Sequence, residues 1–483
     1  MRTPYHRDRT GSGGRVLDTT RGEIVHQLLR IEAEGAFAGL VGGSPGQKVA
    51  KRRLRRKELD KRQQARVTAA VAGVTRRRRR LDWLLQQLLN RPLAKVDPRL
   101  LAILRLGLFE LTMAGKAGHA MSAHVDLAAL IVNKGASGMV NAVLRNAVRQ
   151  LAAGTLPEPA LAPATASLEA RADSLGVALS HPTWLVERWL RRLGDQETAE
   201  LMAANNSEPA YCLRVNRLRT TAAAFKDELC STGAVLAESP LLPEDFLCVE
   251  SGLAGLLRGA ALSDGLCQVQ DHAAGLVVAL LNPQPGEAVL DACAAPGGKA
   301  LYAAARMGGQ GRLVAVDRSA ARLRGLAETG RAQGLPEGFL DVRPGDLQAL
   351  GEQLSAGGGF DRVLVDAPCS GTGVLTKRAD LRWRRTPLDL LDLVALQAEL
   401  LDIAARLVRP GGVLVYSTCS LEPEENEEQI ARFLERTPGF RLQPADALGL
   451  LPPGVLTPQG YLATLPHRHA ADGAFAARLL RAS

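Results

Sequence analysis

Two cysteines in the C-terminal half of the chain each follow a run of apolar residues and are flanked by polar ones. Cys369 lies in DAPCSGTG, and Cys419 lies in YSTCS. A single cysteine at such a position is usually a small, inert hydrophobic residue. A thiolate, however, is a strong nucleophile when its pKa is lowered or when a base lies near it. The two cysteines therefore leave two interpretations open, a pair of structural thiols or a nucleophilic site.

A glycine-rich turn precedes these cysteines in VLDACAAPGGKA, residues 289–300. An apolar strand that runs into such a turn and then into a helix brings backbone N–H groups and a helix N-terminus close to a ligand. The next apolar run ends at Asp317, twenty residues after Gly297, where an acidic residue typically binds the ribose hydroxyls of a nucleotide-like cofactor. The turn matches neither GxGxxG nor the P-loop signature, which disfavours NAD and ATP. A tight turn with a purely structural role is the alternative.

These motifs lie in a segment, residues 264–483, that alternates strand-like and helical runs. The strand-like runs are EAVLDACAA, GRLVAVDRS, FDRVLVDAPCS and GGVLVYSTCS, and a long helix is expected from Leu388 to Val408. Such alternation predicts an α/β, Rossmann-like domain with an open, mostly parallel sheet and helices on both faces. Ligands of these sheets bind outside the carboxyl ends of the strands, which is where the motifs fall.

Two further domains are expected ahead of this one. Residues 15–155 predict an all-α bundle, because apolar residues recur at three- and four-residue spacing, as in Leu81, Leu84, Leu85 and Leu88. Asp97 before Pro98 suits a helix start there. After an Ala- and Pro-rich linker, residues 171–263 combine helices with the strand-like YCLRVNRL and FLCVESG, which is typical of a small α+β module. The 483 residues are therefore interpreted as three domains.

Composition excludes several classes of protein. With 46% hydrophobic and 23% charged residues, the chain is not disordered as a whole. Its apolar stretches fall short of the ~20 residues that span a bilayer, and its first residues lack the apolar part of a secretory signal. The seven cysteines form no close pairs and the eight histidines no HExxH motif. We therefore expect no bound metal, and reduced thiols in the cytoplasm.

The positive charge is concentrated in one segment. Between Lys48 and Arg80 there are fifteen basic residues and only two acidic ones, Glu58 and Asp60, so this segment has a net charge of +13. The whole chain has a net charge of +10, so the residues outside the segment sum to −3. Such a segment indicates an anionic partner, with nucleic acid favoured, or a solvated helix face or arm. At 4% aromatic residues, an extended base-stacking platform is disfavoured.

The motifs together resemble a known family. DACAAPGGK, DAPCSGTG and STCS, in this order and spacing, are similar to the motifs of the RNA cytosine-5 methyltransferases of the RsmB/NOP family. LRVN at 213–216 and VQD at 269–271 resemble motifs of the family's small RNA-contacting module and of its junction with the catalytic domain. GMVNAVLRNAVR at 138–149 is similar to the NusB-like domain of such enzymes, and the final DGAF echoes a DGFF-type ending. The resemblance covers nearly the whole chain.

The resemblance implies a reaction and roles for individual residues. S-adenosylmethionine would donate a methyl group to carbon 5 of a cytosine while Cys419 is bonded to carbon 6, Cys369 would release the adduct, and Asp366 would hydrogen-bond the base. Asp317 is expected on the cofactor ribose and Asp346 near its adenine. The complete cofactor site implied is Cys293, Ala294, Ala295, Pro296, Gly297, Gly298, Lys299, Asp317, Asp346 and Asp366. The RNA contacts implied are Arg214, Asn216 and Arg378.

The resemblance also implies a partner, the RNA of the small ribosomal subunit (16S rRNA), and thereby a role in rRNA processing and ribosome biogenesis as a cytoplasmic monomer that binds no membrane. The family often has a proline after the arginine that follows its PC motif, whereas Arg378 is followed here by Ala379. Two alternatives are a tRNA cytosine-5 methyltransferase and a non-catalytic RNA-binding factor in ribosome assembly. Methylation of an adenine amino group is disfavoured, because the motif that begins at Asp366 reads Asp-Ala-Pro-Cys.

Overall fold

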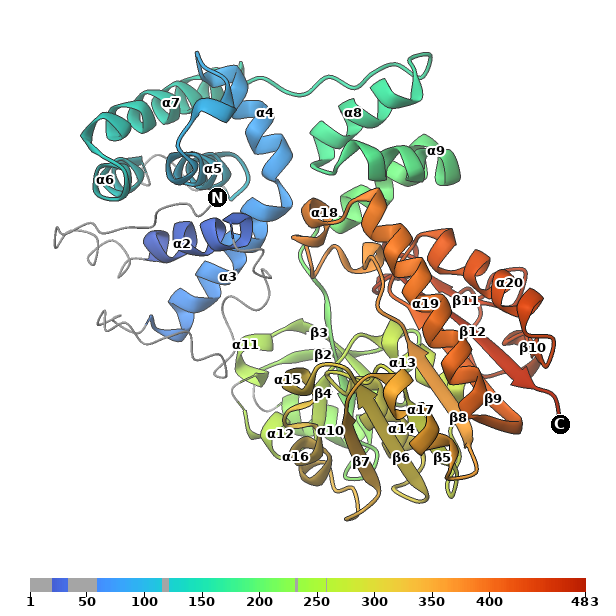
Figure 1. Cartoon of the computed structure of the whole chain (residues 1–483). Coiled ribbons are helices and arrows are strands. Elements are labelled where there is room, and N and C mark those ends of the chain that lie inside the picture. Colours follow the sequence, from blue (N-terminus) through green and yellow to red (C-terminus); the bar gives the residue numbers. More distant parts are fainter. Residues whose placement is uncertain (1–19, 34–58, 115–120, 231–232, 258) are drawn as a thin grey trace. The chain divides into compact units, whose positions relative to one another are not determined.

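The computed structural model describes residues 20–33, 59–114, 121–230, 233–257 and 259–483 (Figure 1). The chain forms two compact units. The first, the helical unit, comprises Met1–Ser207 together with Leu375–Arg384. The second, the catalytic unit, comprises Glu208–Val374 and Arg385–Ser483.

The helical unit is all-α in its described residues, as predicted. Its main core consists of leucines, isoleucines, valines and alanines from the helices of residues 20–152, including the predicted stripe at Leu81, Leu84, Leu85 and Leu88. Asp97 accepts a hydrogen bond from the backbone N–H of Arg99, and Pro98 opens the helix, so the expected start is confirmed. Its helices are α2 (Thr20–Ala33), α3 (Lys61–Arg76), α4 (Arg78–Leu88), α5 (Pro98–Thr112), α6 (Met121–Ile131), α7 (Lys134–Ala152), α8 (Leu168–Leu179), α9 (Thr183–Asn205) and α18 (Leu381–Arg384).

The five arginines 76–80 lie at the junction of α3 and α4, and none of them is fully exposed. Arg79 bonds the carbonyl of His181 and the side chains of Asp173 and Thr183. Arg80 bonds the carbonyl of Ala178 and the carboxylate of Glu158. The guanidinium groups of Arg79 and Arg80 therefore hold helices of the unit together. An RNA contact of the basic segment stays a prediction. Residues 48–57 lie outside the described part of the chain.

A ten-residue excursion, Leu375–Arg384, leaves the catalytic unit and packs within the helical unit. At its centre Arg382 is 1% exposed, and its guanidinium donates to the side chain of Asn206 and to backbone carbonyls. The indole N–H of Trp383 donates to the carbonyl of Thr75, and the guanidinium of Arg78 lies 4.5 Å above its ring. The excursion is thus bound by specific contacts, and nothing in the sequence pattern indicated it.

The catalytic unit begins with a small antiparallel sheet of order β2-β3-β1-β4. Its side chains alternate: Leu213 and Val215 face α10, while Cys212 packs on the face toward α13. The elements are β1 (Tyr211–Val215), α10 (Ala222–Cys230), β2 (Val235–Glu238), β3 (Phe246–Ser251), α11 (Leu253–Leu256), α12 (Ala260–Ser263) and β4 (Cys267–Val269). The predicted α+β module is confirmed.

The large sheet has the order β10-β12-β9-β8-β5-β6-β7, with β11 paired to β12. The five strands from β9 to β7 are parallel, and the C-terminal strands join antiparallel, so the sheet is mixed. The strands are β5 (Ala288–Asp291), β6 (Arg312–Asp317), β7 (Leu340–Pro344), β8 (Phe360–Asp366), β9 (Val408–Thr418), β10 (Phe440–Leu442), β11 (Leu462–Thr464) and β12 (Ala474–Arg481).

Helices cover both faces of this sheet (Figure 1). Successive strand residues enter different cores: Val289 packs into the core that contains α13 and α14, while Leu290 packs into the core that contains α19 and α20. Strands buried on both faces are apolar throughout, which explains why the sequence predicted them well. The helices are α13 (His272–Leu281), α14 (Gly298–Arg306), α15 (Ala320–Leu323), α16 (Leu326–Ala332), α17 (Leu347–Ser355), α19 (Pro387–Leu407), α20 (Glu427–Arg436) and α21 (Pro466–His469).

Candidate active site

The candidate site lies at the carboxyl ends of four adjacent parallel strands. Asp291 ends β5, Asp317 ends β6, Asp366 ends β8, and Cys419 follows the last residue of β9. The strand register places Asp366 beside Ser417 and Asp291 beside Leu364. Because parallel strands present their carboxyl ends at one edge of a sheet, residues far apart in sequence meet there.

The two predicted catalytic cysteines are in contact. The sulfur atoms of Cys369 and Cys419 are 3.3 Å apart, and the N–H of Gly373 donates to the carbonyl of Cys419 at 2.9 Å. The hydrogen bond with Cys419 and burial raise the pKa of Cys369 well above its ordinary value. Cys369 therefore stays a thiol, and its S–H can donate to the sulfur of Cys419. The role of Cys419 as the nucleophile stays a prediction.

A lysine and a serine orient the carboxylate of Asp366. The ammonium of Lys299 lies 2.7 Å from one carboxylate oxygen, and the hydroxyl of Ser417 donates to the other at 2.9 Å. Although burial lowers it, the pKa of Lys299 is raised overall by Asp366 and, more weakly, by Cys419 and Asp291. The lysine is thus a cation next to both the carboxylate and the nucleophilic sulfur, where it stabilises negative charge.

Asp291 is the most deeply buried of the aspartates at the strand ends, at 2% exposure. Burial, and then the neighbouring Asp366, raise the pKa of Asp291 to about 7. Burial also raises the pKa of Cys293, which makes that cysteine an inert thiol. Sequence reasoning included Cys293 in the cofactor site but overlooked Asp291, although this aspartate stands in the same motif.

The glycine-rich turn is anchored to the end of β6. Asp317 accepts hydrogen bonds from the N–H of Ala295 at 3.0 Å and from that of Ser319 at 2.8 Å. Gly297 has a φ of 109°, and a Cβ there would stand 2.2 Å from a methyl group of Leu326. The turn therefore requires glycine at this position for two separate reasons.

The other residues of the predicted cofactor site occupy the same edge. Ala294 and Ala295 are buried, Pro296 follows a cis peptide bond, and Gly298 begins α14. Asp346 is exposed at the N-terminus of α17, where its side chain accepts from the N–H of Gln348. The structure thus brings the predicted cofactor residues to one edge of the sheet.

A buried glutamate, Glu425, ties the loop of Cys369 to the strand of Cys419. Its carboxylate accepts from the N–H of Ser370 at 2.8 Å, from the hydroxyl of Ser370 at 2.5 Å and from the amide of Gln397 at 2.9 Å. Its carbonyl accepts from the hydroxyl of Tyr416 at 2.7 Å. Sequence reasoning missed Glu425, because the acidic stretch LEPEENEEQ resembles a solvated helix start.

Two further contacts position the same loop. Arg385 donates to the carbonyls of Cys369 and Ser370, each at 3.1 Å. The N–H of Gly473 donates to the carbonyl of Gly373 at 2.8 Å, and a Cβ on Gly373 would stand 2.4 Å from the carbonyl oxygen of Gly473. The DGAF motif therefore acts as a backbone partner of the GTG turn.

The predicted RNA contacts lie apart from this cluster. Arg214 is 1% exposed and donates to the side chain of Gln268 at 2.6 Å, with its guanidinium 5.2 Å above the ring of Tyr302. Asn216 is also buried and donates to the carbonyls of Gly265 and Gln333. In this conformation neither side chain is available to a nucleotide. Arg378 lies in the excursion that packs within the helical unit, so the structure does not group it with the cysteines.

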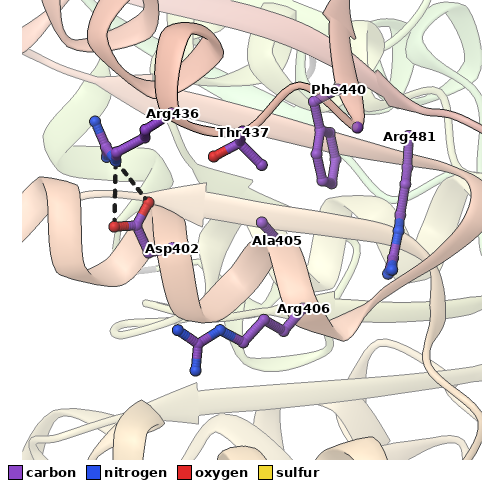
Figure 2. Close-up of a pocket in the computed structure, with 8 residues that line it drawn as sticks. Asp402, Ala405, Arg406, Arg436, Thr437, Phe440 and Arg481 are labelled. Carbon is purple, nitrogen blue, oxygen red and sulfur yellow. Dashed lines mark hydrogen bonds and ion pairs between the residues drawn. The ribbon is translucent and has the colours of Figure 1, made fainter.

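A separate hollow lies at the opposite edge of the large sheet. It is lined by residues near the end of α19, together with Arg436, Phe440 and Arg481, and Asp402 pairs with Arg436 across it (Figure 2). The end of α19 leads into the amino end of β9, whereas Cys419 follows the carboxyl end. This hollow is therefore not part of the candidate site.

Comparisons with known proteins agree with the fold and the site. Residues 278–480 match the family described as 16S rRNA methyltransferase RsmB/F, residues 19–149 match the NusB family, and residues 181–252 match the ferredoxin-like domain of the RsmF/B-like methyltransferases. No helix in the described ranges combines the length and apolarity that a membrane span requires.

The relatives give the same result over nearly full length. A probable ribosomal RNA small subunit methyltransferase B of Synechocystis sp. is 39% identical over 86% of this chain and 90% of its own. The ribosomal RNA small subunit methyltransferase B of Vibrio cholerae is 34% identical over 82% of this chain and 88% of its own. A solved methyltransferase homologue from Pyrococcus horikoshii is 27% identical, with a TM-score of 0.55, over 64% of this chain and 97% of its own.

Fold and site together define an RNA methyltransferase with a two-thiol centre at the carboxyl edge of a Rossmann-like sheet. More specifically, the chain belongs to the 16S rRNA methyltransferase RsmB/F family. The predicted family, fold class and enzyme class are thereby confirmed.

Proposed function

We propose that this protein transfers a methyl group from S-adenosylmethionine to carbon 5 of a cytosine in 16S rRNA, by way of a covalent bond between Cys419 and carbon 6 of the base. The observation that carries the proposal is the contact of Cys369 and Cys419, 3.3 Å apart, beside the Lys299–Asp366 pair. The names of the relatives support small-subunit rRNA as the substrate.

The carboxyl edge of the sheet fits the proposed cofactor. Three carboxylates, those of Asp317, Asp346 and Asp366, and the buried carboxyl of Asp291 stand at or just beyond the strand ends, together with the ammonium of Lys299 and the guanidinium of Arg322. An acidic edge suits a ligand that carries positive charge and ribose hydroxyls. S-adenosylmethionine, when bound, supplies an electrophilic methyl group on a sulfonium. The residues that would hold it are those of the turn 293–299, with Asp317 at the ribose and Asp346 near the adenine.

The residues of the chain then account for each step on the base. Carbon 5 of cytosine is a weak nucleophile, and addition of the Cys419 thiolate to carbon 6 makes it enamine-like. Asp366 hydrogen-bonds the base and favours its protonated, electrophilic form. After carbon 5 has gained the methyl group, its proton passes to solvent and the electron pair of that C–H bond forms the double bond between carbons 5 and 6. The bond from carbon 6 to Cys419 then breaks, Cys419 leaves as a thiolate, and the aromatic ring is restored. Cys369 acts in this release.

RNA binding is proposed for the helical unit and the small sheet. Arg214 and Asn216 would act indirectly, by holding β1 and the loop after it in place from within the protein. Arg378 would act from the excursion, where it is partly exposed. A tRNA substrate remains the alternative target within the same chemistry, and the NusB family match over 19–149 supports the ribosomal one.

Paired cysteine variants test the chemistry. Cys419→Ala is expected to abolish methyl transfer to RNA, because the Cys419 sulfur forms the bond to the cytosine. S-adenosylmethionine binding should stay nearly unchanged, because this side chain is proposed to contact the base and not the cofactor. Cys369→Ala is expected to accumulate a covalent protein–RNA adduct that migrates slowly on a denaturing gel. Undiminished turnover of Cys419→Ala would contradict the mechanism, and absence of the adduct in Cys369→Ala would contradict the release role.

The target is tested independently of the chemistry. Bisulfite sequencing of total RNA is compared between the parent strain and a strain that lacks the gene. We expect one cytosine of 16S rRNA that is protected from conversion in the parent strain to be converted in the deletion strain. Loss of protection in a tRNA instead would transfer the proposal to tRNA. Unchanged protection throughout would favour the non-catalytic assembly factor.

A further inference from the structure

A second pair of cysteines, separate from the catalytic one, lies in the small sheet. Cys212 on β1 and Cys248 on β3 are directly opposite each other in the antiparallel register, and their sulfur atoms are 3.2 Å apart. The N–H of Val215 donates to the carbonyl of Asp245, so these two opposite residues are a hydrogen-bonded pair of the antiparallel ladder. Hydrogen-bonded and non-hydrogen-bonded pairs alternate along such a ladder, and Cys212 and Cys248 lie three positions further along it. They are therefore a non-hydrogen-bonded pair, in which the Cα atoms are typically about 4.5 Å apart. That spacing lies within the range of disulfides, about 4.4–6.8 Å.

The surroundings activate one of the two thiols. Nδ1 of His272, the first residue of α13, lies 4.0 Å from the sulfur of Cys248. The hydrogen bond from Cys212, and then His272, lower the pKa of Cys248 to about 5 despite its burial. Although burial opposes it, Cys248 and Asp271 raise the pKa of His272. Cys248 is thus a thiol of lowered pKa beside a histidine, which is the arrangement of a reactive cysteine.

The two thiols also differ in access. Cys212 is 4% exposed, whereas Cys248 is partly exposed. A third cysteine of this sheet, Cys267, is buried on the opposite face, where burial raises its pKa to about 12. A small oxidant can therefore reach Cys248 first, with Cys212 placed directly behind it and Cys267 unable to take part.

We propose that Cys248 and Cys212 form a reversible disulfide when the protein meets a hydroperoxide. The Cys248 thiolate attacks the peroxide oxygen, so that the O–O bond breaks, Cys248 becomes a sulfenic acid, and hydroxide (or an alkoxide) leaves. The Cys212 thiol then attacks the Cys248 sulfur, the S–O bond breaks, and water leaves. In total two thiols lose two electrons and two protons, and the peroxide is reduced. A dithiol reductant restores both thiols.

The same three side chains, Cys212, Cys248 and His272, are close enough to hold a metal ion. The structure favours the disulfide, because Nδ1, which faces Cys248, is already bonded to the hydroxyl of Ser239 at 2.9 Å. That hydroxyl is itself fixed by the N–H groups of Leu241 and Leu242. A metal would have to displace this bond, whereas a disulfide leaves it intact.

Mass spectrometry of the full-length protein tests the proposal. The reduced protein is treated with hydrogen peroxide, its remaining thiols are blocked with N-ethylmaleimide, and it is digested. Trypsin alone leaves Cys230 and Cys248 in one peptide, since no lysine or arginine lies between Lys226 and Arg258, so glutamyl endopeptidase is added. The expected product is a peptide pair joined through Cys212 and Cys248 that disappears after dithiothreitol. The separate peptides of Cys369 and Cys419 distinguish it from a link in the catalytic pair.

Single variants identify the order of events. Cys212→Ser is expected to leave a sulfenic acid on Cys248 that dimedone captures, and Cys248→Ser is expected to remove the link. Cys267→Ser is the matched control from the same sheet, and the link should form in it as in the wild type. Recovery of Cys248 as a blocked free thiol after peroxide would overturn the proposal. So would release of stoichiometric zinc from the untreated protein together with protection of both thiols, which would identify a metal site instead.

Discussion

At the scale of single residues, the two catalytic cysteines carry the same group in different surroundings. Cys369 is held by Arg385 and by Glu425 through Ser370, and burial and its contact with Cys419 keep it protonated. Cys419 stands nearer to positive charge, that of Lys299. The proposed division of labour between a nucleophile, Cys419, and a releasing thiol, Cys369, would therefore come from neighbours that are distant in sequence.

Glu425 offers the first prediction at this scale. The carboxylate of Glu425 accepts three hydrogen bonds, two from Ser370 and one from Gln397. In Glu425→Gln, one carboxylate oxygen is replaced by an NH₂ group, which cannot accept from these donors. Loss of a charge-assisted hydrogen bond in a buried site costs about 1.5–3 kcal/mol, so kcat should fall on the order of 10- to 100-fold. S-adenosylmethionine affinity should change little. Single-turnover methyl transfer and equilibrium binding measure the two effects.

The control for this prediction is Glu427→Gln, which changes an exposed carboxylate two residues away. It should behave as the wild type in both assays. If Glu425→Gln also retained full single-turnover activity, the positioning role of Glu425 would have to be abandoned.

Asp291 offers a prediction about pH. Its pKa is raised from 3.8 to about 7, so between these values the folded protein retains a proton that the unfolded chain has lost. Folding stability from this residue therefore decreases as pH rises from about 4 to about 7, by at most about 1.4 kcal/mol per pH unit. Asp291→Asn should be more stable than the wild type, and its advantage should be larger at pH 8 than at pH 5. Thermal unfolding at both pH values measures this, and an advantage independent of pH would contradict the raised pKa.

At the scale of elements, the site depends on how parallel strands end. The carboxyl ends of β5, β6, β8 and β9 supply the aspartates and Cys419, and the loops that follow are held by backbone hydrogen bonds. Each loop has a fixed partner: the turn after β5 has Asp317, the loop after β8 has Glu425, and the GTG turn has Gly473. The strands position the chemistry, and these partners limit the movement of the loops.

A glycine in the GTG turn provides the prediction for this scale. Gly373→Ala would place a Cβ 2.4 Å from the carbonyl oxygen of Gly473. The backbone must therefore shift, which should lower the free energy of unfolding by about 1–3 kcal/mol. Because the N–H of Gly373 donates to the carbonyl of Cys419, the rate of methyl transfer should also fall by at least about tenfold. Gly439→Ala is the matched control, since a Cβ there meets nothing within 4 Å. Equal activity of the two variants would exclude a role for this close approach.

At the scale of the whole molecule, the basic residues that the structure describes in this segment differ in exposure. Arg79 and Arg80 bond α8 and its surroundings within the helical unit, whereas Lys61, Arg62 and Arg66 on α3 are exposed. Of these five cations, the three on α3 can approach a phosphate without breaking contacts within the protein.

This division predicts opposite behaviour of two variants. Neutralising Lys61, Arg62 and Arg66 together should reduce the slope of log affinity for RNA against log salt, by ~0.7 for each lost phosphate contact on a single strand. Arg79→Gln should leave that slope unchanged and lower the free energy of unfolding of the helical unit by about 1–3 kcal/mol, because the carbonyl of the buried His181 loses its donor. Filter binding over a salt series and thermal unfolding measure the two. A slope unaffected by the triple variant would mean that this face is merely solvated.

Much of the fold and site could be predicted from the sequence. Four of the eight strands of the large sheet, β5, β6, β8 and β9, were recognisable because they are apolar on both faces. Their motifs were recognisable because a strand, its turn and the next residues are contiguous. The same contiguity explains why Lys299, Asp317, Asp366, Cys369 and Cys419 were selected, and the structure brings them together at one edge.

Tertiary structure alone decided the remaining features. Folding made Arg79 and Arg80 of a basic run into contacts between helices, and it made Glu425, which the sequence suggests is solvated, a buried hydrogen-bond acceptor. It also made Leu375–Arg384 part of the helical unit. It also placed Cys212 against Cys248, although 36 residues separate them in the chain. The sequence by itself determined which residues can do chemistry, because side-chain type and local order are written in it. The fold determined which of these residues lie together in a buried site. The reason is that hydrogen-bond partners, desolvation and pKa depend on residues that are distant in sequence and that only folding brings near.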